Sequence, residues 1–166
     1  FISRSDQNEL SLNKASLNLK ELLDVIVEQF QPLAREKGLT MNVQAPNHLP
    51  VYGDTDQLTR LFVNLLDNAV RYTPANGLIN IEARNSPGGI QVMIHNSGAG
   101  ISPQHLPHMF ERFYRVDADR SSLTGGTGLG LSIAQEIVRL HGGKISISSE
   151  AGNGVKLTVS LPVNTR

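Results

Sequence analysis

Apolar residues recur along the chain with two different spacings. Over residues 19–37, 54–72 and 129–140 they return every three or four positions, which is the spacing of an amphipathic helix. Asp54 opens the second segment as an N-cap residue, and Pro74 closes it, because the residue before a proline avoids the α region. The pattern therefore predicts three helices.

A strict alternation of apolar and polar residues marks the expected strands. They cover residues 39–45, 78–84, 90–95, 144–149 and 155–161, with a short further strand at 51–53. The Pro87-Gly88-Gly89 turn joins the second and third of them, and the last two form a final hairpin. Hairpins pair strands antiparallel, so we predict an α+β fold: a two-layer sandwich of a mixed, mostly antiparallel sheet with helices on one face.

Composition and charge narrow the class of protein. A chain of 166 residues is long enough to bury one full core. Fifteen basic residues balance fifteen acidic ones, so we expect no nucleic-acid partner and no direct membrane contact. The absence of cysteine excludes disulfides, thiol chemistry and Cys-based zinc sites. No apolar run approaches the ~20 residues that a membrane span needs.

The chain opens at Phe1 without an initiator methionine. We therefore expect it to be a piece excised from a larger parent. Such a parent could be membrane-bound while this piece is not.

The first candidate for chemistry lies on the predicted helix 54–72. Four polar residues fall within roughly 100° of one another at 3.6 residues per turn, beside the apolar stripe. They are Asn64, Asn68, Arg71 and Tyr72. Amide oxygens can ligate Mg²⁺, a guanidinium can pair with phosphate and a phenol ring can contact a purine. The alternative is a surface helix with polar residues along its edge.

The second candidate, Asn96-Ser97-Gly98-Ala99-Gly100, directly follows a predicted strand. Glycines at this spacing let the backbone turn tightly and approach a ligand closely. Asn96 could pair with the amine of an adenine. The alternative is a turn that merely ends the strand.

The third candidate is the run Gly125-Gly126-Thr127-Gly128-Leu129-Gly130 at the start of a helix. Free N–H groups at a helix N-terminus, preceded by glycines, suit phosphates. The order of glycines matches neither a P-loop nor a dinucleotide fingerprint. The alternative is a flexible hinge before the helix.

The fourth candidate is the segment Met109 to Arg115, rich in aromatic and basic residues. The aromatic residues could anchor a long loop to the body of the domain, and the arginines could meet phosphate. The alternative is a short amphipathic helix.

In this order, the four candidates resemble the N, G1, F and G2 boxes of the histidine-kinase catalytic domain, within the ATPase superfamily shared with gyrase, Hsp90 and MutL. Residues 64–73 are similar to the N box, 109–117 to the F box and 126–133 to the G2 box, with Leu140-His141-Gly142-Gly143 following. The resemblance runs from about residue 17 to residue 162.

The resemblance implies the Bergerat fold, with ATP and Mg²⁺ held in a cleft under a mobile lid of about 101–127. It implies an ATP-binding domain over 17–166, and the end of a dimerisation helix with its connector over 1–16. Asn64 and Asn68 would face Mg²⁺, and Asn64 and Arg115 would be the catalytic residues. The other nucleotide-binding positions that it implies are Asn68, Arg71, Tyr72, Asn96, Gly98, Gly100, Ile101, Tyr114, Gly126, Thr127, Gly128, Leu129 and Gly130.

Two residues depart from what a strong ATPase would carry. The G1 box usually begins with aspartate, and here it begins with Asn96. An amide oxygen accepts the adenine amine without charge assistance, so we expect binding weaker by about 1 kcal/mol, roughly five- to tenfold. Related ATPases such as gyrase place a glutamate base where Asn64 stands. Asparagine cannot take a proton at neutral pH, so hydrolysis should be slow.

None of the five histidines is followed by the His-Glu-Leu-Arg-like box of an acceptor site. They are His48, His95, His105, His108 and His141. We therefore expect the substrate histidine to lie on a separate dimerisation domain of the parent, and a response regulator to be a further partner.

Three functions remain open from the sequence. The leading one is the ATP-binding catalytic domain of a two-component sensor histidine kinase, a protein-histidine kinase in a cytoplasmic part of a membrane sensor. The others are a self-sufficient ATPase of the superfamily and a nucleotide-free or weakly binding interaction module.

Overall fold

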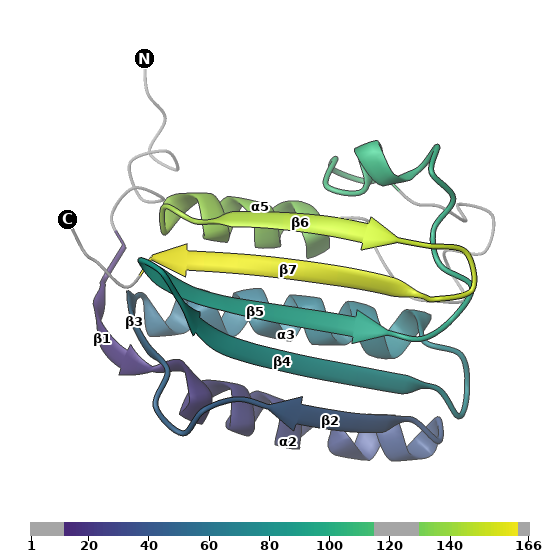
Figure 1. The fold of residues 1–166 in the computed structure, drawn as a ribbon, viewed down its shortest axis with the longest axis horizontal. Helices are drawn as coiled ribbons and strands as arrows, with labels where there is room; N and C mark the ends of the chain where they lie inside the picture. The colour runs from purple at the N-terminus through teal and green to yellow at the C-terminus, as the bar shows by residue number, and fades with distance from the viewer. Residues whose placement is uncertain (1–11, 115–129, 163–166) are drawn as a thin grey trace.

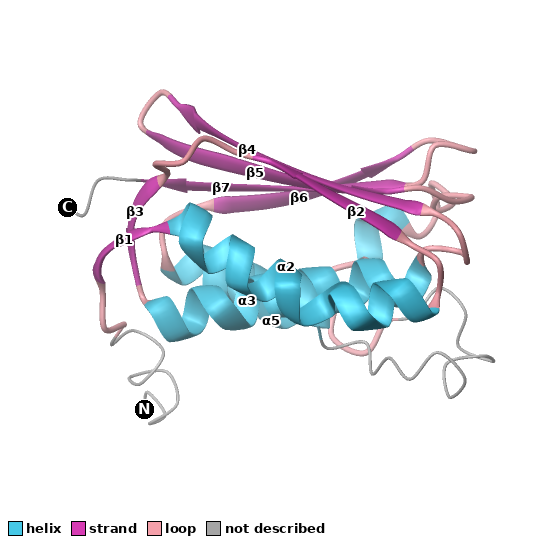
Figure 2. Ribbon diagram, turned by 90° about the horizontal axis from the view of Figure 1, so that it is seen from below, coloured by secondary structure: helices cyan, strands magenta, loops and turns pink. Residues whose placement is uncertain are grey.

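Three helices cover one face of a five-stranded sheet, so the molecule has two layers (Figures 1 and 2). The computed structural model describes residues 12–114 and 130–162. The helices of the layer are α2 (Leu19–Glu36), α3 (Thr55–Tyr72) and α5 (Gly130–Leu140), and a short 3-10 helix, η1, covers Leu106–His108. The α+β sandwich predicted from the hydrophobic pattern is confirmed.

The strands of the main sheet lie in the order β2-β4-β5-β7-β6. Their bounds are Thr40–Gln44 for β2, Leu78–Ser86 for β4, Gly89–Asn96 for β5, Val155–Pro162 for β7 and Lys144–Ser149 for β6. β2 and β4 are parallel, and the other three neighbouring pairs are antiparallel. A parallel pair needs a crossover connection, and α3 lies in the chain between these two strands.

The core lies between the sheet and the helices. Along β4, Ile79, Ile81 and Ala83 are buried while the residues between them face outward, as the period of two requires. α3 presents a stripe of buried apolar residues to them: Leu58, Leu61, Phe62, Leu65, Leu66, Ala69 and Val70. Complete burial of one large apolar side chain contributes about 1.5–3 kcal/mol, so this stripe fixes the orientation of α3 on the sheet.

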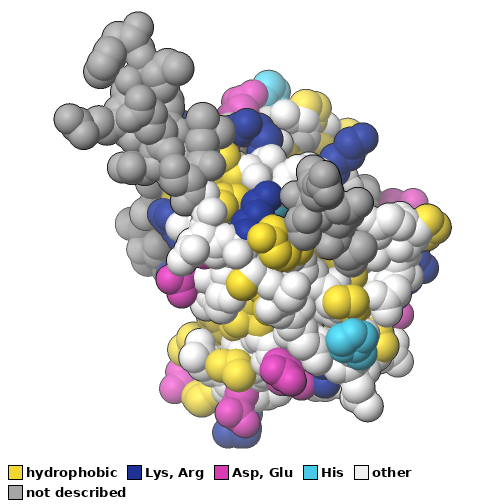
Figure 3. All heavy atoms as spheres, turned by 90° about the vertical axis from the view of Figure 1, so that its left-hand side faces the viewer, with side chains coloured by type: hydrophobic (Ala, Val, Ile, Leu, Met, Phe, Trp, Pro, Cys, Tyr) yellow, Lys and Arg dark blue, Asp and Glu magenta, His cyan; other side chains and the backbone are white. Residues whose placement is uncertain are grey.

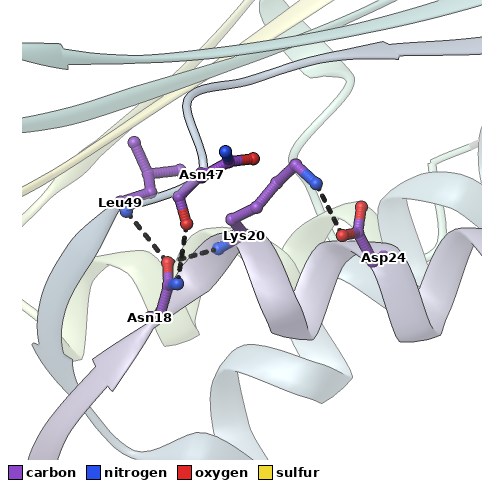
Figure 4. Close-up of polar contacts among 5 residues, drawn as sticks. All are labelled: Asn18, Lys20, Asp24, Asn47 and Leu49. Carbon is purple, nitrogen blue, oxygen red and sulfur yellow. Dashed lines mark hydrogen bonds and ion pairs between the residues drawn. The ribbon is translucent and has the colours of Figure 1, made fainter.

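The start of α2 is fixed by the side chain of Asn18 (Figure 4). Its Oδ1 accepts the N–H of Lys20 at 3.1 Å, which caps the helix, and the N–H of Leu49 at 2.9 Å. Its Nδ2 donates to the backbone oxygen of Asn47 at 2.9 Å. One amide therefore begins the helix and ties it to the segment before the next strand.

A second, two-stranded sheet pairs β1 (Ala15–Asn18) with β3 (Pro50–Gly53) in antiparallel register. It lies at the end of the molecule that faces the viewer in Figure 3, where basic and acidic side chains are interspersed. The predicted division between connector and catalytic domain after residue 16 stays a prediction, although β1 begins at Ala15.

Candidate functional site

The two asparagines predicted to face a ligand lie one turn apart on α3. Asn64 and Asn68 are both partly buried, at the edge of the apolar stripe. The Asn64 Nδ2 atom is buried without a hydrogen-bond partner among the residues that the structure describes. A buried amide donor left unpaired costs about 1–3 kcal/mol, so this atom is suited to an acceptor supplied by a ligand.

The last turn of α3 carries the other two predicted residues. Arg71 and Tyr72 are exposed, and the Arg71 Nε donates to the Asp67 Oδ2 at 2.9 Å. Thr73 is completely buried and closes the helix, because both its N–H and its hydroxyl donate to the Ala69 oxygen, at 3.0 and 2.5 Å. The helix end is thereby fixed while Tyr72 stays accessible.

Asn96 ends β5 and is 8% exposed. Among the described residues, its Nδ2 donates to the neighbouring Ser97 oxygen alone, at the long distance of 3.4 Å. Gly98 and Gly100 follow with φ of +140° and +90°, values that side chains rarely adopt. The glycines predicted to let the backbone turn tightly therefore do so beside a buried amide.

The turn between β6 and β7 packs against residues 100 and 101, next to Asn96. The sequence did not predict this contact. The Ser149 Oγ accepts the N–H of Ile101 at 2.7 Å and donates to the Gly154 oxygen at 2.7 Å. A Cβ added at Gly100 would stand 2.6 Å from that same Oγ. The available signal was the glycine at 154, between two strands, where a Cβ would collide with the Asn96 oxygen.

The end of α3 meets the end of β5. A Cβ at Gly98 would lie 3.2 Å from the Pro74 Cδ, and one at Gly77 would lie 2.9 Å from the Ser97 Oγ. The Ser97 Oγ also accepts the N–H of Leu78 at 2.9 Å. The structure therefore places the residues that follow α3 directly against the turn after β5.

Within the segment around η1, three aromatic rings contact one another. The Tyr114 hydroxyl contacts the His105 Nδ1 at 2.5 Å, and the His108 ring stacks on the tyrosine with centroids 5.2 Å apart. Met109 and Phe110 pack against the core, as the anchoring hypothesis predicts. Phe113 instead is 67% exposed and has a left-handed φ of +64°.

Gly130 is the first residue of α5, and no atom of the described residues lies within 4 Å of a Cβ built there. The predicted residues Arg115, Gly126, Thr127, Gly128 and Leu129 lie outside the described part of the chain.

His141 connects the two helices that carry the asparagines and the glycine-rich segment. It is buried at the end of α5, and its Nε2 accepts the N–H of Asp54, the N-cap of α3, at 3.0 Å. Its Nδ1 lies 2.8 Å from the Ile137 oxygen, so the ring is neutral and protonated at Nδ1. Burial lowers the pKa of His141.

Burial raises the pKa of the Asp54 carboxyl, but backbone N–H donors, led by that of Asn13, outweigh it and hold the pKa below its ordinary value. Asp54 also accepts the N–H of Gln57 at 3.1 Å, which caps α3 as predicted.

Within residues 12–114 and 130–162, no group of three or more His, Asp or Glu side chains could hold a metal ion. A divalent cation here would depend on the asparagine oxygens and on oxygens of a ligand. Among the helices of these same ranges, none has the length and apolar character to cross a membrane.

Known proteins resemble this chain over most of its length. The family model for histidine kinase-, DNA gyrase B- and HSP90-like ATPases matches residues 53–165. The signal transduction histidine-protein kinase BaeS of Escherichia coli (strain K12) is 37% identical over 162 residues, which are 98% of this chain and 35% of BaeS. The sensor histidine kinase CusS of the same strain is 36% identical, over 98% of this chain and 33% of CusS. The chain thus spans about a third of the length of these relatives.

Solved structures of histidine kinases are also similar to this chain. The catalytic domain of the histidine kinase ThkA in a nucleotide-free form has a TM-score of 0.82 and 28% identity, covering 92% of this chain and 97% of that domain. ThkA in complex with the response regulator protein TrrA gives a TM-score of 0.77 and 26% identity, covering 91% of this chain and 42% of ThkA.

Proposed function

This chain belongs to the family of histidine kinase-, DNA gyrase B- and HSP90-like ATPases. We propose that α3 and the turn over residues 96–100 bind ATP, whose γ-phosphate is then transferred to a histidine. The acceptor histidine would lie on a dimerisation domain of the same parent protein. The observation that carries the proposal is the buried Asn64 amide, whose donor lacks a partner among the described residues, on the helix that meets the G1-like turn.

The residues present fit a nucleotide. The unpaired Asn64 N–H suits a phosphate oxygen. In the alternative orientation, with the amide turned by 180°, its oxygen would stand in the same place and could ligate Mg²⁺. Asn68, one turn later, supplies a second amide to the same ligand. Asn96, whose side chain makes one long hydrogen bond within residues 12–114 and 130–162, has an amide oxygen to offer an adenine amine. Gly98 and Gly100 keep the backbone of this corner free of side chains.

The resemblance to the histidine-kinase catalytic domain assigns the roles of the remaining predicted residues. Tyr72 would lie near the base, and Arg71, Tyr114 and Arg115 would lie on the phosphate side. The glycines at 126, 128 and 130 would cradle the triphosphate, with Thr127 and Leu129 as further nucleotide-binding positions. Ile101 forms part of the adenine pocket beside Ser149, whose hydroxyl holds its N–H.

Bound Mg·ATP supplies the transferable phosphoryl group and the counter-charge for it. The chain supplies position and charge rather than a base, since Asn64 cannot accept a proton at neutral pH. A neutral imidazole needs no base to act as nucleophile, whereas water does. Phosphotransfer is therefore favoured over hydrolysis.

The test is to mix the domain with the dimerisation segment of its parent and radiolabelled Mg·ATP. We expect label on the histidine of that segment and little release of free phosphate. Bound ATP without transfer in any such mixture would contradict the kinase assignment, and rapid steady-state phosphate release would favour a self-sufficient ATPase.

The weakly binding interaction module is the second candidate, and Asn96 is the observation that favours it. Calorimetry with Mg·ATP at millimolar concentration separates the two: heat of binding supports the kinase, and its absence supports the module. For the parent protein we propose a response regulator as partner, by analogy with the ThkA–TrrA complex, and a cytoplasmic position for this domain beneath a membrane sensor.

A further inference from the structure

Lys37 joins the end of α2 to the end of α3. It is the C-cap residue of α2, and its Nζ donates to the backbone oxygens of Val70 and Arg71, both at 2.8 Å. Its own backbone oxygen accepts the N–H of Asn76 at 3.0 Å. Lys37 therefore bonds to the last turn of α3 and also to Asn76, in the segment that connects α3 to β4.

These contacts complete the C-terminus of α3. The last carbonyls of a helix lack intrahelical donors and carry partial negative charge, which a cation stabilises. Thr73 satisfies the Ala69 oxygen, and Lys37 satisfies the next two. Burial lowers the pKa of Lys37, so part of its hydration has been exchanged for these two oxygens.

The turn that contains Lys37 and Gly38 packs closely against residues 73–77, which connect α3 to β4. Gly38 follows it in a left-handed conformation with φ of +74°, and the Asn76 side chain occupies the place where a Cβ would stand. The first residue of β2, Thr40, donates its N–H to the Gly77 oxygen at 3.0 Å. The connection is thus bonded along its length to the α2–β2 corner.

The opposite side of the connection faces the candidate nucleotide site. A Cβ at Gly77 would stand 2.6 Å from the Thr73 Cγ2 and 2.9 Å from the Ser97 Oγ. Pro74 lies against Gly98 in the same way. Residues 73–77 are therefore confined between the Lys37 corner and the G1-like turn, and a shift on one side is passed to the other.

From this arrangement we propose that Lys37 is a positioning residue for the nucleotide site. It sets the place of the α3 end and of residues 73–77, and through them the place of Tyr72 and of the turn after Asn96. This inference rests on the proposed binding of ATP.

The test compares nucleotide affinity in three variants. Lys37→Met removes both hydrogen bonds and should weaken binding of Mg·ATP about fivefold. Lys37→Arg keeps a cation with several donors and should restore affinity to within about twofold of the original chain. Lys20→Met is the matched control, because Lys20 lies on the same helix and its ammonium group pairs with Asp24 at the surface, at 2.6 Å (Figure 4).

The readouts are calorimetry for affinity, thermal unfolding for stability, and backbone amide resonances of residues 72–77 and 97–98. Lys37→Met should move both sets of resonances, and Lys20→Met neither. If Lys37→Met does not fold, Lys37→Gln, whose side chain is too short to reach both oxygens, is measured with the same expectation. A melting temperature lowered by Lys37→Met or Lys37→Gln with unchanged affinity would overturn the inference. Failure of the unsubstituted domain to bind Mg·ATP would instead refute the proposed function.

Discussion

Single residues at the candidate site are neutral where related ATPases use charge. Asn96 replaces a carboxylate that the resemblance leads one to expect, and Asn64 replaces a glutamate base. Within the described part of the chain, Asn96 is buried with one long hydrogen bond, and Asn64 has an unpaired buried donor. In the proposed site, a bound ligand would satisfy both amides better.

Asn96→Asp should tighten binding of Mg·ATP about five- to tenfold, because a carboxylate accepts the adenine amine with charge assistance. Without nucleotide the same change should lower stability, since a buried carboxylate is costly. Calorimetry and urea unfolding measure the two effects. Asn85→Asp, at an exposed position near the end of β4, is the control and should change neither. Unchanged affinity in Asn96→Asp would remove Asn96 from adenine recognition.

Asn64, Asn96, Gly98 and Gly100 could be proposed as site residues from sequence because each has a local signal: helical spacing, or a turn after a strand. Ser149 has no such signal of its own, although the glycine at 154 marks the turn that follows it. Its contacts with Ile101 and Gly154 depend on how β5, β6 and β7 assemble, which local spacing does not encode.

At the scale of elements, periodicity and capping residues determine where helices begin and end. The predicted helices differ from α2, α3 and α5 by about a residue, because Asp54, Pro74 and Gly38 mark their ends chemically. The β1–β3 sheet was not predicted as a sheet. β1 has four residues without alternating burial, so no pattern distinguishes it from a linker.

Asn18→Ala should lower the free energy of unfolding by about 1–2 kcal/mol, because it removes the cap of α2 and two hydrogen bonds to residues 47–49. Urea unfolding monitored by circular dichroism measures the loss. Asp24→Ala, which breaks an exposed ion pair on the same helix, should cost under about 0.5 kcal/mol. Equal losses in the two variants would mean that Asn18 does no more than an exposed surface residue.

At the scale of the whole molecule, α3 and α5 are joined through one buried imidazole. The His141 Nε2 accepts the Asp54 N–H, a contact that a protonated ring cannot make. The folded chain therefore binds this proton less readily than the unfolded chain, whose histidine has the ordinary pKa of 6.5.

Stability should be highest above about pH 6.5 and should decline as the pH falls below it, since the unfolded state then takes up a proton that the folded state resists. The lowered pKa of Asp54 adds a further loss only below its ordinary value of 3.8. Urea unfolding at pH 7.5 and 5.5 measures the first decline. His141→Gln, which cannot titrate, should flatten it, and an equal decline in that variant would assign the effect to other groups.

The order of strands also determines which part of the chain can change in length during evolution without altering the sheet. β5 and β7 are neighbours in the sheet, although the chain between them includes the whole stretch from Ser97 to Gly154. Their register is set by the sheet, and α5 is held separately by its packing on α3 and by His141. In general, doubling the length of a flexible loop costs only about 0.6 kcal/mol. Evolution can therefore change the length of the chain between β5 and β7 while their pairing in the sheet stays unchanged.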